Sequence, residues 1–163
     1  MPVRPVRNFQ GLRLITDDWP IIVIEFPEVR VPDDALRDCL SCVEDLLKEA
    51  RDGKEWTFTV TDLTRMVEFP SAAQRTCTSE WLTRTFGLQK AASLGGATVT
   101  RSMLLRGVVN AVQWISPPAL PSPFVATRRE AMVEARKAYD ARRIPLRAPL
   151  ADASPRARKS VGS

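Results

Sequence analysis

Hydrophobic and polar positions follow two different periods along the chain. Strands are indicated by a β-branched run at 21–26, by strict alternation at 56–61 and by shorter runs at 12–15, 94–100 and 124–126. Between these runs, apolar residues recur at the 3.6-residue spacing of amphipathic helices. Strands that alternate with helices predict an α/β protein with a mostly parallel sheet and right-handed crossovers.

Four helices are expected, over residues 32–52, 72–86, 102–115 and 127–143. Proline or a polar cap opens each helix, and Gly87 is placed to end the second one. The residues predicted to face the core are Leu36, Cys39, Leu40, Val43, Leu46 and Leu47, then Ala73, Cys77, Trp81 and Leu82, then Leu104, Leu105, Val108, Val112 and Ile115, and finally Ala131, Met132, Ala135 and Tyr139.

The predicted order is β-β-α-β-α-β-α-β-α in a single domain. The strands at 12–15 and 21–26 are expected to pair as a hairpin across a turn at Asp17 and Asp18, which adds an antiparallel edge and makes the sheet mixed. We expect an N-terminal arm at 1–9, the domain at 10–143, and a disordered basic tail at 144–163, where proline, alanine, serine and arginine show no periodicity.

Charge and hydropathy argue against a nucleic-acid reader and against a membrane-spanning protein. The chain of 163 residues has 24 basic and 19 acidic side chains, but the basic excess lies at the C-terminal end, where Arg156, Arg158 and Lys159 offer a weak attraction to nucleic acid or anionic lipid. A nearly neutral folded portion argues against specific nucleic-acid recognition. We expect a cytoplasmic protein without a membrane span, because no long apolar run and no secretory signal are present.

Several catalytic chemistries are excluded by composition. The chain has no histidine, so it has no histidine base, histidine metal ligand or Ser-His-Asp triad. Cys39 and Cys42 have the spacing of a redox or zinc motif but lie inside a predicted helix, and Cys77 stands alone. We therefore predict a core role for Cys39, and a protein that is not an enzyme and uses no cofactor and no metal.

Polar residues gather where the strand at 56–61 leads into the next helix, in the stretch VTDLTRMVEFPSAAQR. Ser71 and Gln74 have the spacing of a helix capping box. The positive end of a helix also stabilises an added anion, so Ser71 is a candidate phosphoacceptor as well. Asp62 and Thr64 either order the loop through bonds to its backbone or belong to a contact surface.

The same junction resembles the STAS domain family (sulfate transporter and anti-sigma factor antagonist), also called SpoIIAA-like. Residues 60–64, Val-Thr-Asp-Leu-Thr, are similar to its hydrophobic-Asp-Leu-Ser/Thr motif, and Pro70-Ser71-Ala72-Ala73 falls on its Asp-Ser-Ser-Gly. Residues 124–131 resemble its last strand and helix start. Because Ser71 alone matches the second motif, the resemblance is to a divergent member.

What the resemblance implies is a single STAS-like domain that acts as a regulatory, protein-interaction module. Ser71 falls at the position that a partner kinase phosphorylates in anti-sigma factor antagonists, so the expected partner is a kinase or an anti-sigma-like protein. The expected partner-binding surface consists of Asp62, Thr64, Arg65, Glu68, Gln74 and Arg75.

Two other functions remain open from the sequence. A pocket between the sheet and the helices that carry Trp81 and Trp114 would hold an apolar ligand or lipid. Alternatively, the hairpin edge at 21–26 would join copies of the chain into a homo-oligomer. Gly95 and Gly96 are interpreted as a tight turn into a strand.

Overall fold

The computed structural model describes residues 4–146 as an α/β domain with one mixed sheet. The elements are β1 (Arg7–Phe9), β2 (Leu12–Ile15), β3 (Ile21–Glu25), α1 (Asp33–Asp52), β4 (Thr57–Asp62), α2 (Ala72–Ala92), β5 (Ser93–Val99), α3 (Met103–Ile115), β6 (Phe124–Val125) and α4 (Arg128–Ala141). The six strands lie in sequence order. β1, β2 and β3 are antiparallel neighbours, and β3 to β6 are parallel. The predicted α/β class, hairpin and mixed sheet are confirmed.

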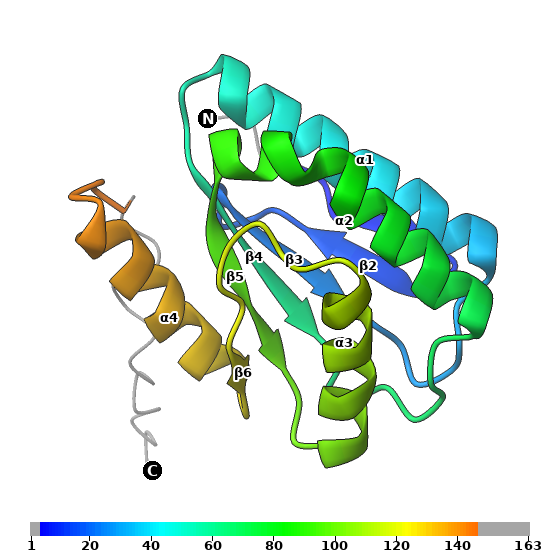
Figure 1. The fold of residues 1–163 in the computed structure, drawn as a ribbon. Helices are drawn as coiled ribbons and strands as arrows, with labels where there is room; N and C mark the ends of the chain where they lie inside the picture. The colour runs from blue at the N-terminus through cyan, green and yellow to red at the C-terminus, as the bar shows by residue number, and fades with distance from the viewer. Residues whose placement is uncertain (1–3, 147–163) are drawn as a thin grey trace, which may run out of the picture.

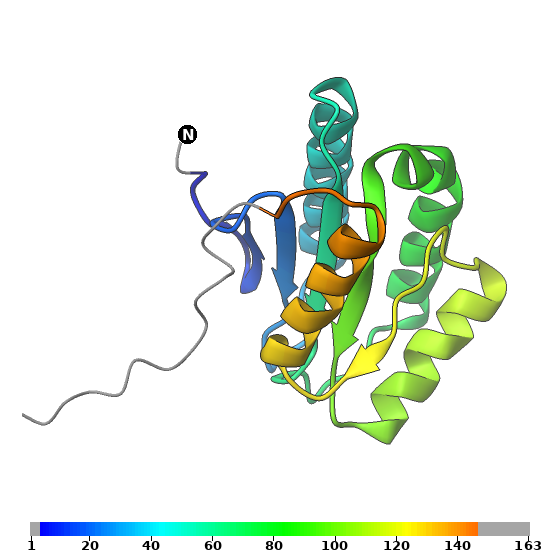
Figure 2. The same ribbon diagram turned by 90° about the vertical axis from the view of Figure 1, so that its left-hand side faces the viewer.

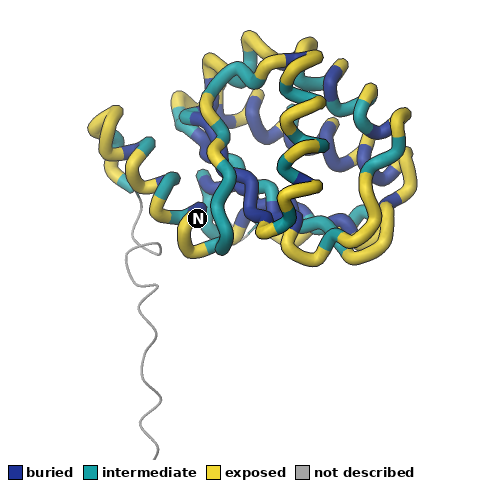
Figure 3. The backbone as a smooth tube through the Cα atoms, turned by 60° about the horizontal axis from the view of Figure 1, so that its bottom comes forward, coloured by how far each residue is buried: buried dark blue, intermediate teal, exposed yellow. Residues whose placement is uncertain are grey.

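Helices cover both faces of the sheet. Figures 1 and 2 show α4 on one side and α1 and α2 together on the other. One core lies between α1 and strands β2 and β3, and a second lies between α4 and strands β3, β4 and β5. Figure 3 shows the result, with dark buried strands between helices whose outer sides are exposed. The predicted inward residues of α1 and α4 pack as expected.

The alternation of β4 divides its side chains between these two faces. Phe58 and Val60 join the core under α4. Thr59 and Thr61 point the other way, toward the side of α1, α2 and α3. Central strands of parallel sheets are usually apolar on both faces, since helices cover both. The threonine face of β4 is therefore an exception that calls for an explanation.

The predicted N-terminal arm and oligomer edge are both corrected by the topology. Residues 7–9 form β1 and pair with β2, so the sheet begins inside the proposed arm. β1 is consequently the edge strand on this side, whereas β3 lies between β2 and β4 and has both edges occupied. Strand addition at residues 21–26 is therefore wrong as a route to a homo-oligomer.

Two helix predictions are also corrected. Helix α2 continues past Gly87 to Ala92, because Leu88 packs on the core and Ala92 is fully buried. A glycine costs only about 1 kcal/mol inside a helix, which this packing offsets. Ala73, expected to face the core, is exposed on α2, while Gln74 is buried instead.

Helix α3 differs most from expectation. Of its predicted core stripe, Leu105 is buried and Val108 and Val112 are half-buried, but Leu104 and Ile115 are exposed. The outer face of the helix is apolar as well, and Trp114 on that face is 88% exposed. Periodicity could not choose the inner face, because the apolar arc of this helix is wider than the strip that the sheet covers.

Glycines allow β5 to adopt its path beside β4. Gly95 has φ +117, and a Cβ there would lie 2.6 Å from the Pro121 carbonyl oxygen. A Cβ on Gly96 would lie 2.4 Å from the Thr59 carbonyl oxygen. The pair lies within β5 at an irregularity in its pairing with β4 rather than in a turn before the strand, which corrects the earlier interpretation.

The C-terminal boundary extends slightly further than expected. Ile144 and Leu146 pack against the core under α4, so the ordered domain includes them. The remainder of the predicted tail, with Arg156, Arg158 and Lys159, lies outside the described residues. Among the helices within 4–146, none combines the length and apolar character needed to cross a membrane.

Candidate functional site

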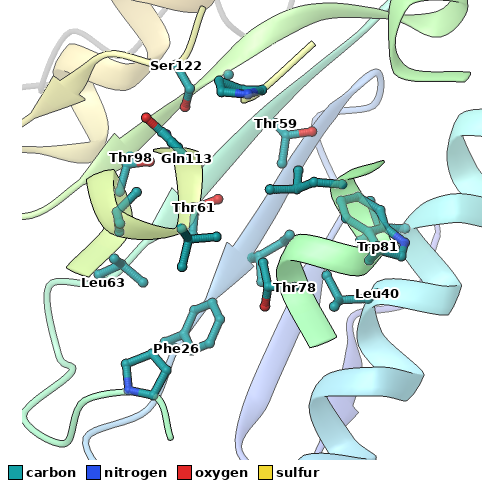
Figure 4. A pocket seen from close by; sticks show the side chains of 18 of the residues that line it. Phe26, Leu40, Thr59, Thr61, Leu63, Thr78, Trp81, Thr98, Gln113 and Ser122 are labelled. Atoms are coloured by element: carbon teal, nitrogen blue, oxygen red, sulfur yellow. The ribbon is translucent and has the colours of Figure 1, made fainter. Parts of the chain in front are cut away.

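A cavity of about 260 Å³, partly open to solvent, lies between the sheet and helices α1, α2 and α3 (Figure 4). Its walls are mainly apolar and include Phe26 after β3, Leu40 on α1 and Trp81 on α2. Leu105, Val108, Val109 and Val112 contribute the α3 side. Because an apolar cavity of roughly 150 Å³ is enough to bind benzene, this one has room for a larger molecule.

The cavity exists because small side chains occupy the sheet where large ones are usual. Its floor is formed by Thr59 and Thr61 on β4 and by Gly96 and Thr98 on β5. Gly96 adds no side chain to this floor, and β5 there lies so close to β4 that a Cβ would lie 2.4 Å from the Thr59 carbonyl oxygen. Protein interiors are normally filled to near crystal density, so a void of this size in a small domain is unusual.

Five polar side chains that line the cavity, three of them on its floor, lack hydrogen-bond partners within the part of the chain described. Thr59, Thr61, Thr98, Gln113 and Ser122 line the cavity, and no hydrogen bond to their side chains is formed among residues 4–146. Thr61 lies directly opposite Thr98 in the parallel pairing of β4 with β5. In Figure 4, Gln113, Thr98 and Ser122 gather on one side, whereas Phe26, Leu40 and Trp81 lie on the other.

The lining carries very little charge. Arg75 on α2 is the single charged residue that lines the cavity among the described residues, and its Nη1 already donates to the Pro70 carbonyl oxygen at 2.7 Å. No acidic side chain in the described range lines it. The cavity is thus suited to an uncharged molecule with a large apolar part.

The predicted junction is located beside this cavity, and its hydrogen bonds choose between the roles predicted for its residues. Asp62 at the end of β4 is 6% exposed and accepts hydrogen bonds from the Thr64 amide at 3.0 Å and hydroxyl at 2.6 Å. It also accepts from Arg128 Nε on α4 at 2.8 Å, and Arg128 contacts Glu25 as well. Asp62 therefore orders the loop, which confirms one of the two predicted roles, and connects α4 to the sheet; its placement on a partner-binding surface is wrong.

The ionisation of Asp62 follows from these contacts. Burial alone would raise its pKa, but hydrogen bonds from Thr64 and the Arg128 guanidinium outweigh burial and hold the pKa below its ordinary value. For Arg128, burial acts to lower the pKa, and the hydrogen bonds to Asp62 and Glu25 raise it above the usual value. The group is consequently a stable ion pair rather than a pair poised for acid–base chemistry.

Ser71 and Gln74 form the predicted capping box at the start of α2. The Gln74 amide donates to Ser71 Oγ at 3.1 Å, and the Ser71 amide donates to Gln74 Oε1 at 3.3 Å. Gln74 Nε2 also donates to the Val31 carbonyl oxygen at 2.6 Å and the residue is buried, so Gln74 does not belong to an exposed surface. Ser71 itself is half-buried.

The loop between β4 and α2 has an inner and an outer side. Leu63, Met66 and Pro70 line the cavity. Residues facing solvent include the predicted Thr64, Arg65 and Glu68, together with the apolar Val67 and Phe69. Arg30 Nε donates to the Phe69 carbonyl oxygen at 2.7 Å and fixes this part of the loop. The loop is therefore part of both the cavity wall and the molecular surface.

Of the remaining predictions, the one for Cys39 is confirmed and the one for the two tryptophans is correct for only one of them. Cys39 is buried, and burial, together with Cys42, raises the pKa of its thiol to about 12, so the core role is confirmed and a reactive thiolate is disfavoured. Trp81 lines the cavity as predicted, but Trp114 points away from it into solvent, which corrects that half of the pocket prediction.

The floor threonines were not identified from the sequence, although a signal for them is present. Thr57, Thr59 and Thr61 alternate along a strand that is flanked by helices on both sides, where apolar residues are expected.

Comparison of the chain with models of protein families, with curated proteins and with solved structures finds no match in any of the three.

Proposed function

We propose that the protein binds a small, largely apolar molecule in the cavity between the sheet and helices α1, α2 and α3, without catalysing a reaction on it. The observation that carries the proposal is the cavity of about 260 Å³ with apolar walls and a threonine floor. A structural core would gain stability from larger side chains at Thr59 and Thr61, so their small size is better explained by a ligand.

A cavity-filling substitution tests this function. Val112→Phe on the inner side of α3 places a ring in the cavity and is expected to abolish binding while the fold is retained. Ala111→Phe, on the exposed side of the same helix, is the matched control and should leave binding unchanged. Mass spectrometry of the gently purified full chain would detect a bound molecule in the control and not in Val112→Phe. Equal occupancy in the two variants would exclude the cavity as the binding site.

A second candidate function is the STAS-type interaction module inferred from the sequence resemblance. It is favoured by the exposed Val67 and Phe69, which lie among Thr64, Arg65 and Glu68 on the outer side of the loop before Ser71. Apolar side chains surrounded by polar ones are typical of a partner-binding surface. A kinase or an anti-sigma-like protein is the proposed partner, and phosphorylation of Ser71 would add negative charge at the start of α2.

This second function is tested separately from the first. Phe69→Ser should weaken binding to a purified candidate partner without affecting the cavity, and Val133→Ser on α4, another exposed apolar site, is the control. Incubation with serine kinases followed by peptide mass spectrometry would locate phosphate on Ser71. The switch is rejected if no kinase modifies Ser71 and if Ser71→Asp and Ser71→Ala bind the partner equally.

A further inference from the structure

The polar floor of the cavity indicates what kind of molecule it accepts. Thr98 is 5% exposed, and its hydroxyl has no partner among the described residues. The hydroxyl lines the cavity and is not among the fully buried polar atoms, so it is accessible there and free to bond to a ligand. The side chains of Thr59, Thr61, Gln113 and Ser122, which are half-buried, share the lining with it and also have no hydrogen-bond partner among the described residues.

These side chains form a continuous patch rather than scattered sites. Thr61 and Thr98 are direct neighbours across β4 and β5. The Ser122 hydroxyl lies 3.6 Å from the position that a Cβ of Gly96 would take, which places it over the same strand. Gln113 reaches toward Thr98 from α3, as Figure 4 shows. We call Thr61, Thr98, Gln113 and Ser122 the polar patch.

The chemistry of the polar patch favours an uncharged partner. Hydroxyl and amide groups both donate and accept hydrogen bonds, and the patch contains no cation to neutralise a carboxylate or phosphate. The one charged lining residue, Arg75, belongs to the α2 side near Pro70, where its guanidinium is engaged. An anionic head group placed on the patch would remain unpaired in an apolar site.

We propose that the ligand is an uncharged amphiphile, whose hydroxyl or amide head group bonds to the polar patch while its apolar body lies against Phe26, Leu40 and Trp81. This inference rests on the proposed binding function and specifies its ligand class. The cavity volume is about 260 Å³. At about 30 Å³ per water-sized group, suitable probes have roughly nine non-hydrogen atoms.

Three probes of matched shape test the head group by NMR titration of the full chain: ethylbenzene, 2-phenylethanol and phenylacetate. If the patch binds a hydroxyl, 2-phenylethanol should bind at least as tightly as ethylbenzene, although a hydroxyl normally weakens transfer to an apolar site. Phenylacetate should bind at least tenfold more weakly than 2-phenylethanol.

Substitutions test whether the polar patch causes the preference for 2-phenylethanol. Thr98→Val removes the hydroxyl at nearly constant shape and should weaken 2-phenylethanol binding about tenfold while leaving ethylbenzene unchanged. Thr61→Val is a second test should the first variant fail to fold. Thr76→Val, the same change at an exposed site on α2, is the control and should alter neither probe.

The possible failures are distinguishable. If ethylbenzene binds and 2-phenylethanol does not, or if Thr98→Val and Thr61→Val leave the preference intact, the head-group inference is overturned and the apolar site stands. If phenylacetate binds most tightly of the three, its carboxylate pairs with Arg75 rather than with the polar patch, and the head-group inference is overturned as well. If no probe binds to the wild-type chain, the proposed binding function fails together with the inference.

Discussion

Asp62 illustrates how one carboxylate can connect three parts of the fold. It ends β4, bonds to the following Thr64 and accepts from Arg128, which lies 66 positions further along the chain. The sequence showed a polar residue at a strand end and predicted either loop ordering, which the Thr64 bonds confirm, or an exposed contact, which burial of Asp62 excludes. Its partner on α4 could not be recognised, because only the folded topology brings the two residues together.

Asp62→Asn is expected to lower the free energy of unfolding by about 1–2 kcal/mol at neutral pH, since a charge-assisted bond is lost and Arg128 is partly screened by solvent. Because folding lowers the pKa of Asp62, its contribution is fully present above the unfolded value of about 3.9 and is lost as pH falls through the lower folded value. Urea unfolding at several pH values should show a weaker acid dependence in the variant. Identical pH profiles would contradict this role.

Thr98 has the opposite energetic character. Thr98→Val should not lower the free energy of unfolding in the absence of ligand and should raise it by at most about 1 kcal/mol, because a hydroxyl with no partner within the described fold is replaced by a methyl group. Chemical denaturation of the two proteins measures the difference. A loss of stability would mean that the hydroxyl is bonded within the fold and is unavailable to a ligand.

At the scale of single elements, the start of α2 was predicted more successfully than its end. The capping box needs only Ser71 and Gln74, which are close in sequence, whereas continuation past Gly87 depends on packing of Leu88 and Ala92 against other elements. Local hydrogen-bond patterns can be predicted from the sequence, but a helix end set by tertiary contacts cannot.

Ser71→Ala should destabilise the protein by about 1 kcal/mol through loss of the cap, while Ser71→Asp should remain within a few tenths of wild type, because aspartate is an equally good cap at the positive helix end. Thermal unfolding of the three proteins provides the comparison. If alanine costs nothing, the serine is not retained for helix stability, and its role must be sought in modification or binding.

The apolar pattern of helix α3 did not predict which of its residues are buried. Its apolar residues cover a wide arc beside the polar stripe of Arg106, Asn110 and Gln113, so the pattern predicted a buried stripe but could not identify which part of the arc faces the sheet. The β4 alternation was correctly predicted, yet which of its faces meets which helix depends on the placement of α3 and α4. The cavity arises from that placement and from the small floor residues, so most of the site was not predictable from sequence alone.

At the scale of the whole molecule, the two faces of the sheet have different roles. The α4 face is filled by Phe58, Val60 and Tyr139, and the Tyr139 hydroxyl bonds to the Trp56 carbonyl oxygen. The opposite face encloses the cavity beneath α3. The α4 face is thus filled, whereas the opposite face combines the core under α1 with the proposed binding cavity.

Ligand binding should therefore stabilise the entire domain, because the cavity is bounded by the sheet and three helices that must all be folded. At a 2-phenylethanol concentration one hundred times its dissociation constant, the free energy of unfolding should rise by roughly 2.7 kcal/mol. Urea titrations with and without the compound measure this gain, and Val112→Phe should abolish it. A gain that persists in that variant would place binding elsewhere.

The contrasting environments of two tryptophans have a practical consequence. Trp81 is in the cavity wall with its indole nitrogen buried, and Trp114 is almost fully in water on the outer side of α3. The emission of Trp114 should be red-shifted and readily quenched by acrylamide, whereas that of Trp81 should be blue-shifted and shielded. In a chain whose Trp19 and Trp56 are replaced by phenylalanine, Trp81 would report on the proposed occupancy of the cavity and Trp114 would serve as an internal reference.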